Sequence, residues 1–316
     1  MKKKVVVIGG GNGSATIINA LKKYVDDIEL SAVISMSDSG GSSGRLRDEF
    51  DTLPPGDILR AVLAMSPYDY KLLRKIFNKT RFEGVGKLDG HNLGNLFLVL
   101  GEKYAGDWAT SVHALGQAVE AIGNVYPVTI EKSDLCVELS NGDILIGEHE
   151  IDRPRYERSI KINRAWLQPT PMIFDGANMA IEEADYVIMG PGSLYSSVIA
   201  TLCVEGMKKG ALRNTKAKFI FVAGNGYEGK GETGPEALSD FVSQLENYLP
   251  RPLDLVLYNG HELTAKEQNY YLQKEWHIIL YDPENIVDRE VICADFECDG
   301  GGLDSTKLGI ELMKYF

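Results

Sequence analysis

A short apolar run, a glycine-rich turn and an amphipathic stretch follow one another several times in this sequence, and this repetition constrains the fold more than any other feature. Residues 4–10 read KVVVIGG, and residues 15–25 then place apolar side chains at helical spacing. The same order returns at 184–207 and at 216–249. Strands that alternate with helices in this way form parallel sheets. The sequence therefore predicts an α/β fold with a doubly wound, Rossmann-like and mostly parallel sheet.

The middle of the chain follows a different pattern. Residues 125–152 alternate between apolar and polar side chains, and the SNGD at 140–143 is a hairpin signal. We expect an antiparallel hairpin to be inserted around 125–152 in a single domain that spans 1–316. Helices are expected over 56–65, 69–81 and 90–104, and further strands over 28–36 and 253–260.

Charge and composition exclude several classes of partner. The 316 residues carry a formal net charge of -12, which repels nucleic acid and anionic lipid. The apolar run at 5–9 is too short for a signal peptide, and no run approaches the roughly 18 apolar residues of a membrane span. The four cysteines form no C-x-x-C pair, which argues against a zinc site or a disulfide framework. We expect a cytoplasmic protein without a nucleic-acid or membrane partner.

The first glycine turn follows the first predicted strand. In GGGNGS at 9–14, glycines allow a ligand to approach the backbone, and the following helix directs its N–H groups at an anion. The turn is not a strict G-x-G-x-x-G, because Ser14 stands at the last position, and it is not a Walker A loop. A tight connection without a ligand is the alternative interpretation.

A longer polar segment follows the second predicted strand. Residues 36–57 read MSDSGGSSGRLRDEFDTLPPGD, which we interpret as a loop that forms part of an anion site. Asp38 lies 25 residues after Gly13, near the place where an acid binds a ribose hydroxyl in dinucleotide folds. Arg45 and Arg47 suit phosphate. The alternative is a solvated loop in which these arginines pair with their acidic neighbours at 48–49.

Two more polar segments begin predicted helices. GPGSLYSS at 190–197 follows a strand, and its Ser193 either caps the helix or offers a hydroxyl to phosphate. GHNLGNL at 90–96 offers donors and acceptors without net charge, although a structural histidine in a capped helix is the simpler interpretation. Ligands of doubly wound sheets bind at the carboxyl ends of the strands, so we expect these segments to share one cleft. The spacing around Ser193 is not that of a nucleophilic serine.

Together these segments resemble one family. GGGNGSATIINALK, SDSGGSSGRLRDEFDTLPPGDILRAVLA, GHNLGNLFL and GPGSLYSSVIATLCVEGM are similar to the YvcK family, also called the gluconeogenesis factor family. That family is related to CofD, the 2-phospho-L-lactate transferase. The resemblance implies a Rossmann-like fold that binds UDP-sugars and acts in carbon metabolism, cell-wall precursor supply and cell shape. It also allows a homo-oligomer.

The leading hypothesis is therefore a cytoplasmic factor that binds a nucleotide or nucleotide sugar. The first glycine turn would hold the diphosphate, and Asp38 would bind a ribose or sugar hydroxyl. The arginines would balance the phosphate charge, the segment at 90–96 would orient the base or sugar, and the segment at 190–197 would form the far wall of the cleft. The predicted ligand-binding residues are Gly10, Gly11, Asn12, Gly13, Asp38, Ser39, Gly40, Gly41, Ser42, Arg45, Arg47, His91, Asn92, Asn95, Gly190, Gly192 and Ser193.

Two enzymatic alternatives stay open. A CofD-like transferase would move a phospholactyl group from a guanosine diphosphate carrier to a deazaflavin alcohol, with Asp38 and Asp57 as catalytic acids and Mg²⁺ on Asp38. An NAD-dependent dehydrogenase fits the fold, but no acid–base pair for hydride transfer is evident. Three departures from the family pattern affect the choice. Asn12 replaces a threonine, and Ser37 precedes Asp38 at a place where the family usually has two aspartates. Within 222–234, only a Gly-Glu-Thr remains of the family motif.

Overall fold

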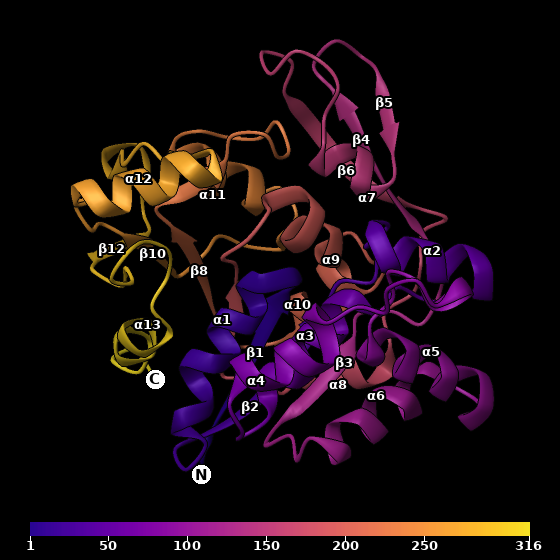
Figure 1. Cartoon of the computed structure of the whole chain (residues 1–316). Helices are drawn as coiled ribbons and strands as arrows, with labels where there is room; N and C mark the ends of the chain where they lie inside the picture. The colour runs from indigo at the N-terminus through magenta and orange to yellow at the C-terminus, as the bar shows by residue number, and fades with distance from the viewer.

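Seven parallel strands form the main sheet, in the order β12-β10-β8-β7-β1-β2-β3 (Figure 1). The computed structural model describes residues 1–316 apart from the side chain of Ala105. The central strands are almost wholly apolar and buried because helices cover both faces of the sheet. The strands of the main sheet are β1 (Lys3–Gly9), β2 (Ile28–Ile34), β3 (Asn124–Pro127), β7 (Tyr186–Met189), β8 (Lys218–Gly224), β10 (Leu255–Asn259) and β12 (Glu290–Ala294).

The direction in which strands are added reverses at β1. From β1 the chain adds β2 and β3 on one side, and β7, β8, β10 and β12 follow on the other. The carboxyl ends of β1 and β7 therefore flank a topological switch point, where ligands of such sheets bind. The predicted doubly wound, mostly parallel fold is confirmed.

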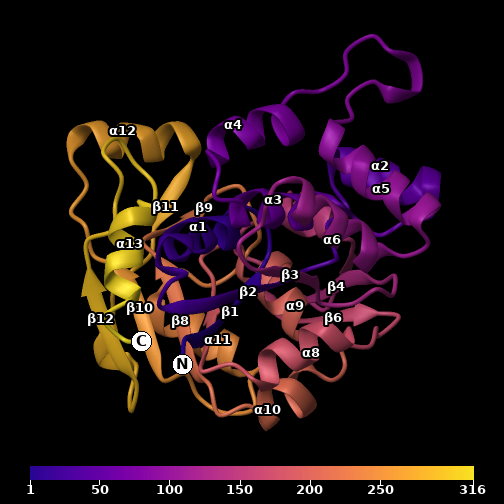
Figure 2. The same cartoon turned by 90° about the horizontal axis from the view of Figure 1, so that it is seen from below.

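Helices form a layer on each side of the main sheet. Figure 2 shows α1, α3 and α13 over one face and α8, α10 and α11 over the other. The helices are α1 (Gly11–Leu21), α2 (Gly41–Phe50), α3 (Gly56–Met65), α4 (Tyr70–Arg74), α5 (Leu93–Ala105), α6 (Trp108–Ala118), α7 (Glu148–Asp152), α8 (Asp175–Glu182), α9 (Ala200–Leu202), α10 (Leu212–Asn214), α11 (Leu238–Glu246), α12 (Ala265–Lys274) and α13 (Ser305–Leu312). Wider helical turns, η2 (Lys75–Lys79) and η4 (Leu194–Ile199), extend α4 and precede α9.

A small antiparallel sheet stands beyond the carboxyl edge of the main sheet (Figure 1). Its order is β5-β4-β6, formed by β4 (Asp134–Leu139), β5 (Ile144–Ile146) and β6 (Ile162–Gln168). The predicted hairpin joins β4 to β5 through 140–143. Residues 124–127 pair with β2 in the main sheet, and the small sheet continues through α7 to 168. A further antiparallel pair joins β9 (Gly226–Glu228) to β11 (Trp276–Ile278).

The polar segment 36–57, which the sequence predicts as a loop, contains a helix. Residues 41–50 form α2, so the interpretation as a loop throughout is wrong. Only Leu46 supplies a large apolar anchor, and Ser42 and Ser43 occupy the other buried positions of the helix. Small hydroxyl side chains filled the inward face, so the usual apolar periodicity of a helix was missing from the sequence.

In the part of the chain that the structure describes, no helix combines the length and the apolar character that crossing a membrane requires.

Candidate functional site

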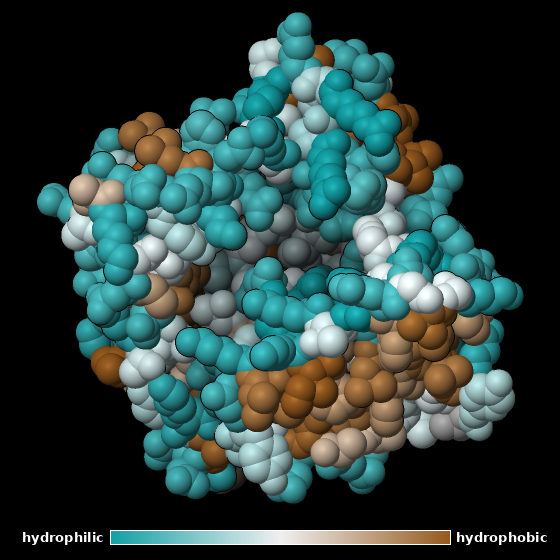
Figure 3. Space-filling view, viewed as in Figure 1, coloured by the Kyte–Doolittle hydropathy of each residue, from teal (hydrophilic) through white to brown (hydrophobic). Residues whose placement is uncertain are grey.

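Two of the predicted glycine turns touch at the switch point. The first turn leads from β1 into α1, and the turn at 190–192 follows β7. A Cβ atom on Gly13 would overlap the carbonyl oxygen of Pro191 and lie 3.2 Å from the Gly192 nitrogen. Only glycine lets the two backbones approach so closely. Figure 3 shows a hollow on this side of the molecule, between the small sheet, α12 and the helices α1 and α3.

The start of α3 brings a carboxyl group and a guanidinium group to the first glycine turn. A Cβ atom on Gly10 would overlap a carboxyl oxygen of Asp57, which lies in the first turn of α3 and forms an ion pair with Arg60. Asp38 reaches the same place from β2, because its carboxyl oxygen would lie 2.6 Å from a Cβ atom on Gly56. Asp38 and Asp57 therefore do lie close together, and Arg60 is the cation beside them.

A second arginine reaches the same turn from α4. Arg74 donates a hydrogen bond to Asn12 Oδ1 at 2.7 Å, and its guanidinium lies 5.9 Å from the centre of the Tyr70 ring. The Nε atoms of Arg60 and Arg74 and the hydroxyl of Tyr70 are buried and have no hydrogen-bond partner among the described residues. Two guanidinium groups with unused donors thus stand beside the Gly10–Gly13 backbone. The sequence reasoning missed both arginines.

Further carboxyl groups gather next to Asp38, where α7 meets the loop after β2. Glu148 Oε2 accepts from the Ser39 N–H at 3.2 Å, and Asp38 Oδ1 accepts from the Gly40 N–H at 2.9 Å. Asp152 lies one helical turn after Glu148 in α7. Burial, followed by the charges of Asp38 and Asp152, raises the pKa of Glu148 to about 9. Burial also raises the pKa of Asp38 and of Asp152.

Glu232 occupies the helix start that follows β7. Its carboxyl accepts from the N–H groups of Tyr195 at 3.1 Å and Ser196 at 3.0 Å. Burial and the charge of Asp152 raise the pKa of Glu232 to about 8. Ser193 makes no capping hydrogen bond with its side chain. The N–H groups at this helix start therefore already bind a carboxyl group of the chain itself.

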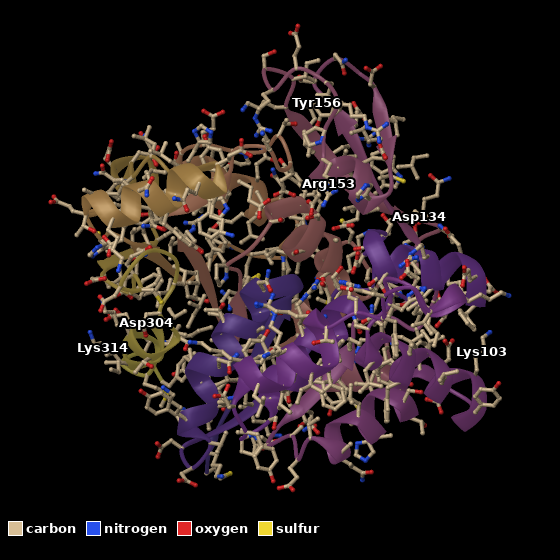
Figure 4. All side chains as sticks on the ribbon, in the orientation of Figure 1. Lys103, Asp134, Arg153, Tyr156, Asp304 and Lys314 are labelled. Atoms are coloured by element: carbon tan, nitrogen blue, oxygen red, sulfur yellow. The ribbon has the colours of Figure 1, made fainter. Side chains whose placement is uncertain are left out.

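Among the described residues, the two arginines predicted from the sequence form no hydrogen bond with the glycine turns at 9–14 and 190–192, although Arg47 donates to the Asp38 carbonyl at 3.5 Å. Arg47 donates to Asp134 at 2.9 Å and to the Ser133 carbonyl at 3.3 Å, which ties α2 to β4. Figure 4 shows Asp134 where the small sheet meets α2. Arg45 is exposed and donates to the Asp89 carbonyl at 3.1 Å. The pairing of both with acidic residues at 48–49 does not occur either.

The polar residues at 91–95 hydrogen-bond with α2. Ser42 Oγ lies 2.9 Å from His91 Nδ1 and accepts from Asn95 Nδ2 at 3.1 Å. Asn92 caps α5 by accepting from the Asn95 N–H at 2.8 Å. Burial, assisted by Arg45, lowers the pKa of His91. Asn92 Nδ2 and Asn95 Oδ1 are buried without a partner among the described residues, so this wall retains one free donor and one free acceptor.

Stability is expected to fall as the pH rises from about 5 to about 9. Glu148 and Glu232 keep their protons in the folded state to about pH 9 and pH 8, whereas they lose them near 4.5 when unfolded. The folded state therefore binds more protons in this window, and each group lowers the free energy of unfolding by up to about 1.4 kcal/mol per pH unit. Urea unfolding at several pH values measures the free energy of unfolding as a function of pH.

Glu148→Gln and Glu232→Gln should make this free energy less dependent on pH, whereas Glu150→Gln, at an exposed position, should leave the dependence unchanged. A free energy of unfolding that rises with pH would contradict the raised pKa values of Glu148 and Glu232.

The comparisons with known proteins agree with one another. Residues 5–296 match the family model described as 2-phospho-L-lactate transferase CofD. A putative gluconeogenesis factor of Thermotoga maritima is 36% identical over 90% of this chain and 87% of its own length. A gluconeogenesis factor of Halalkalibacterium halodurans is 32% identical over 90% and 86%. The match to a putative gluconeogenesis factor of Nostoc, 35% identical over 92% of this chain, covers only 63% of that longer relative.

Solved structures show the same fold. A crystal structure of a protein from Bacillus halodurans superposes with a TM-score of 0.88, at 29% identity, over 99% of this chain and 100% of that chain. A second crystal structure, described as a member of the UPF0052 family from the same organism, gives a TM-score of 0.89 at 27% identity over 99% of each chain.

Proposed function

The chain belongs to the CofD family, among its members named gluconeogenesis factors, and from this premise we propose that it binds a UDP-sugar at the carboxyl edge of its main sheet. One observation carries the proposal: the site has a basic side and a carboxyl-rich side. Arg60 and Arg74 stand beside the first glycine turn. Glu148 and Asp152 form the carboxyl-rich side, and Asp38 adjoins both Glu148 and Arg60. A nucleotide sugar carries the matching groups, because its diphosphate is anionic and its two sugars are rich in hydroxyls.

The basic side suits the diphosphate. The N–H groups at the start of α1 favour the binding of an anion, and the glycines would let the anion approach the backbone. Arg60 and Arg74 each keep an unused Nε donor at this place. Guanidinium groups bind phosphate oxygens through two parallel hydrogen bonds. Arg60 and Arg74 thus supply positive charge at this turn although the whole chain has a net charge of -12, and Asp57 balances part of it through its ion pair with Arg60.

The carboxyl side suits sugar hydroxyls. A neutral carboxyl group both donates and accepts, and burial raises the pKa of Glu148 to about 9, so this group is protonated near neutral pH. Its neighbour Asp152 has one buried oxygen without a partner among the described residues. A hydroxyl group of the ligand would satisfy that oxygen.

We place this binding in the cytoplasm and in the control of carbon metabolism, cell-wall precursor supply and cell shape. The relatives named gluconeogenesis factors support the role in carbon metabolism. The proposed ligand, an activated sugar, supports the roles in cell-wall precursor supply and cell shape. UDP-sugars are activated precursors, so a protein that binds one without consuming it can report the supply of sugar precursors. Binding in this proposal is regulatory and needs no catalytic step.

Transfer of a phospholactyl group is the second candidate, because Asp38 and Asp57 approach each other as that reaction would require. The residues do not fit a magnesium ion, however. Asp57 is paired with Arg60, and Asp38 accepts from the Gly40 N–H. Within the described residues no three His, Cys, Asp or Glu side chains are grouped as metal ligands. We therefore derive no metal-dependent step.

Isothermal titration with UDP-N-acetylglucosamine, with and without Mg²⁺ and beside GDP and NAD, tests the proposal. We expect saturable binding of the UDP-sugar that does not depend on Mg²⁺. Arg45→Ala is the matched control, because Arg45 is exposed and donates to the Asp89 carbonyl, and it should leave the affinity within about threefold of the wild type. No heat and no thermal shift at millimolar UDP-sugar would refute the proposal. Binding of GDP alone, and only with Mg²⁺, would favour the transferase.

A further inference from the structure

Strand β3 leaves one edge of the main sheet without a further strand. It is the last strand in the order of the sheet, and it pairs with β2 alone. Val128, one residue beyond β3, donates to the Ile34 carbonyl of β2 at 2.9 Å. Because alternate residues of a parallel strand face the same neighbour, Asn124 and Tyr126 also face β2, and the N–H and C=O of Val125 point outward. No other backbone segment of the described chain is hydrogen-bonded to Val125.

A groove of about 340 Å³ runs along this edge. Helix α6 forms one wall with Val112, His113 and Gly116, and Tyr126 and Phe174 form the other. Figure 2 shows β3 between α6 and α8, so the groove follows the free edge and does not lie over one face of the sheet. Its volume falls within the usual range of binding pockets, roughly 300–1,000 Å³. The four residues of β3 span about 13 Å at roughly 3.3 Å per residue, which is the length of a short extended segment.

The charged border of the groove is acidic. Glu120 lines the groove, and Glu29 and Glu183 line a smaller cavity that adjoins it at Tyr126. Lys4 also lines the smaller cavity, but it is paired with Glu183 at 2.6 Å. Within the described residues, Glu29 and Glu120 form no ion pair. Burial, followed by the charges of Glu29 and Glu183, raises the pKa of Tyr126, so the electrostatic potential at this wall is negative.

We propose that the β3 edge binds an extended, basic segment of a protein partner as an added β-strand. The N–H and C=O of Val125 pair with the main chain of the partner, whose apolar side chains enter the groove beside α6. Lysine or arginine side chains of the partner meet Glu29 and Glu120. Pro127 has no N–H, so the ladder ends there and the register of the added strand is fixed. A second copy of this chain, with its net charge of -12, is a less favourable occupant. The proposal does not depend on the proposed UDP-sugar.

Fluorescence anisotropy with a labelled peptide that alternates valine and threonine between terminal lysines tests the chemistry of the partner. We expect saturable binding to the full chain, and binding at least about tenfold weaker when glutamates replace the lysines. Peptides with N-methyl groups on the pairing edge should not bind, because the main-chain hydrogen bonds are lost, whereas N-methyl groups on the other edge should change the affinity by less than about threefold. No binding of the lysine peptide at millimolar concentration would overturn the proposal.

Substitutions in the groove test the place of binding. A Cβ atom at Gly116 would lie 3.7 Å from the Ala121 Cβ, so Gly116→Leu fits the helix and places the rest of its side chain in the groove. This variant, through volume, and Glu120→Lys, through charge, should each weaken binding of the lysine peptide at least about tenfold. Gly210→Leu, with nothing within 4 Å of a Cβ atom, and Glu150→Lys, at an exposed position, are the matched controls and should bind like the wild type. Circular dichroism establishes that each variant is folded. A folded Gly116→Leu protein that binds the peptide as tightly as the wild type would overturn the proposal.

Hydrogen exchange at Val125, followed by NMR, distinguishes an added strand from other occupants of the groove. The Val125 N–H should exchange at least about tenfold more slowly when the lysine peptide is bound. Binding that leaves this exchange rate unchanged would overturn the proposal, because the peptide then forms no strand on β3. Exchange that slows as the protein concentration rises, without any peptide, would show that a second copy occupies the groove, and this result would also overturn it.

Discussion

Alanine at Gly13 is expected to destabilise the fold by more than about 3 kcal/mol, because its Cβ atom would overlap the backbone of the neighbouring glycine turn. The carbonyl oxygen of Pro191 and the Gly192 nitrogen are the atoms in the way. A flexible side chain could move aside, but here the obstacle is main chain that continues β7. Relief of the overlap requires the carboxyl ends of β1 and β7 to separate, and with them the centre of the main sheet.

Urea unfolding of Gly13→Ala, followed by circular dichroism, measures this loss. Gly210→Ala is the matched control, because nothing lies within 4 Å of a Cβ atom there. That variant should stay within about 0.5 kcal/mol of the wild type or be slightly more stable. A Gly13→Ala protein with an unchanged midpoint would mean that the two turns are not in contact in solution.

The fold could be predicted because its signals are local. Buried strands such as 5–8 and 186–189 are continuous apolar runs, and the SNGD turn fixes its hairpin within a few residues. Helix α2 could not be predicted in the same way, since Ser42 and Ser43 take the places of apolar side chains in its buried face. The rule that ligands bind at the carboxyl ends of strands also led to the correct expectation that the glycine turns at 9–14 and 190–192 meet.

The charges of the site were harder to predict because they depend on contacts between distant segments. Arg47 pairs with Asp134, 87 residues away, and not with its acidic neighbours. Arg60 looks like an ordinary polar position of a helix until α3 is placed beside the turn after β1. Glu232 belongs to the Gly-Glu-Thr that the sequence retained, but only the fold shows that its carboxyl binds the amides of 195–196. Spacing within one segment carries no information about such pairs.

Replacement of Arg60 by alanine is expected to weaken binding of UDP-N-acetylglucosamine by about 100-fold or more. The side chain stands beside the Gly10–Gly13 turn, and its loss would remove a guanidinium from the proposed diphosphate position while it leaves two carboxylates there. Loss of one partner of a largely desolvated charge pair costs about 2–5 kcal/mol. Arg60→Lys retains the charge but not the two parallel hydrogen bonds, so its affinity should fall between those of the wild type and Arg60→Ala.

Stability must be separated from binding in this experiment, because Arg60→Ala also leaves Asp57 without its counter-ion. That change alone should lower the free energy of unfolding by about 3 kcal/mol. The double variant Asp57→Asn, Arg60→Ala removes both charges and should recover most of the stability without recovering the affinity. Titration calorimetry and urea unfolding on the wild type, Arg60→Ala and the double variant distinguish the effect on binding from the effect on stability. If Arg60→Ala is folded and binds the UDP-sugar as tightly as the wild type, the diphosphate does not lie at the first glycine turn. If the double variant regains both stability and affinity, Arg60 only neutralises Asp57 and does not contact the ligand.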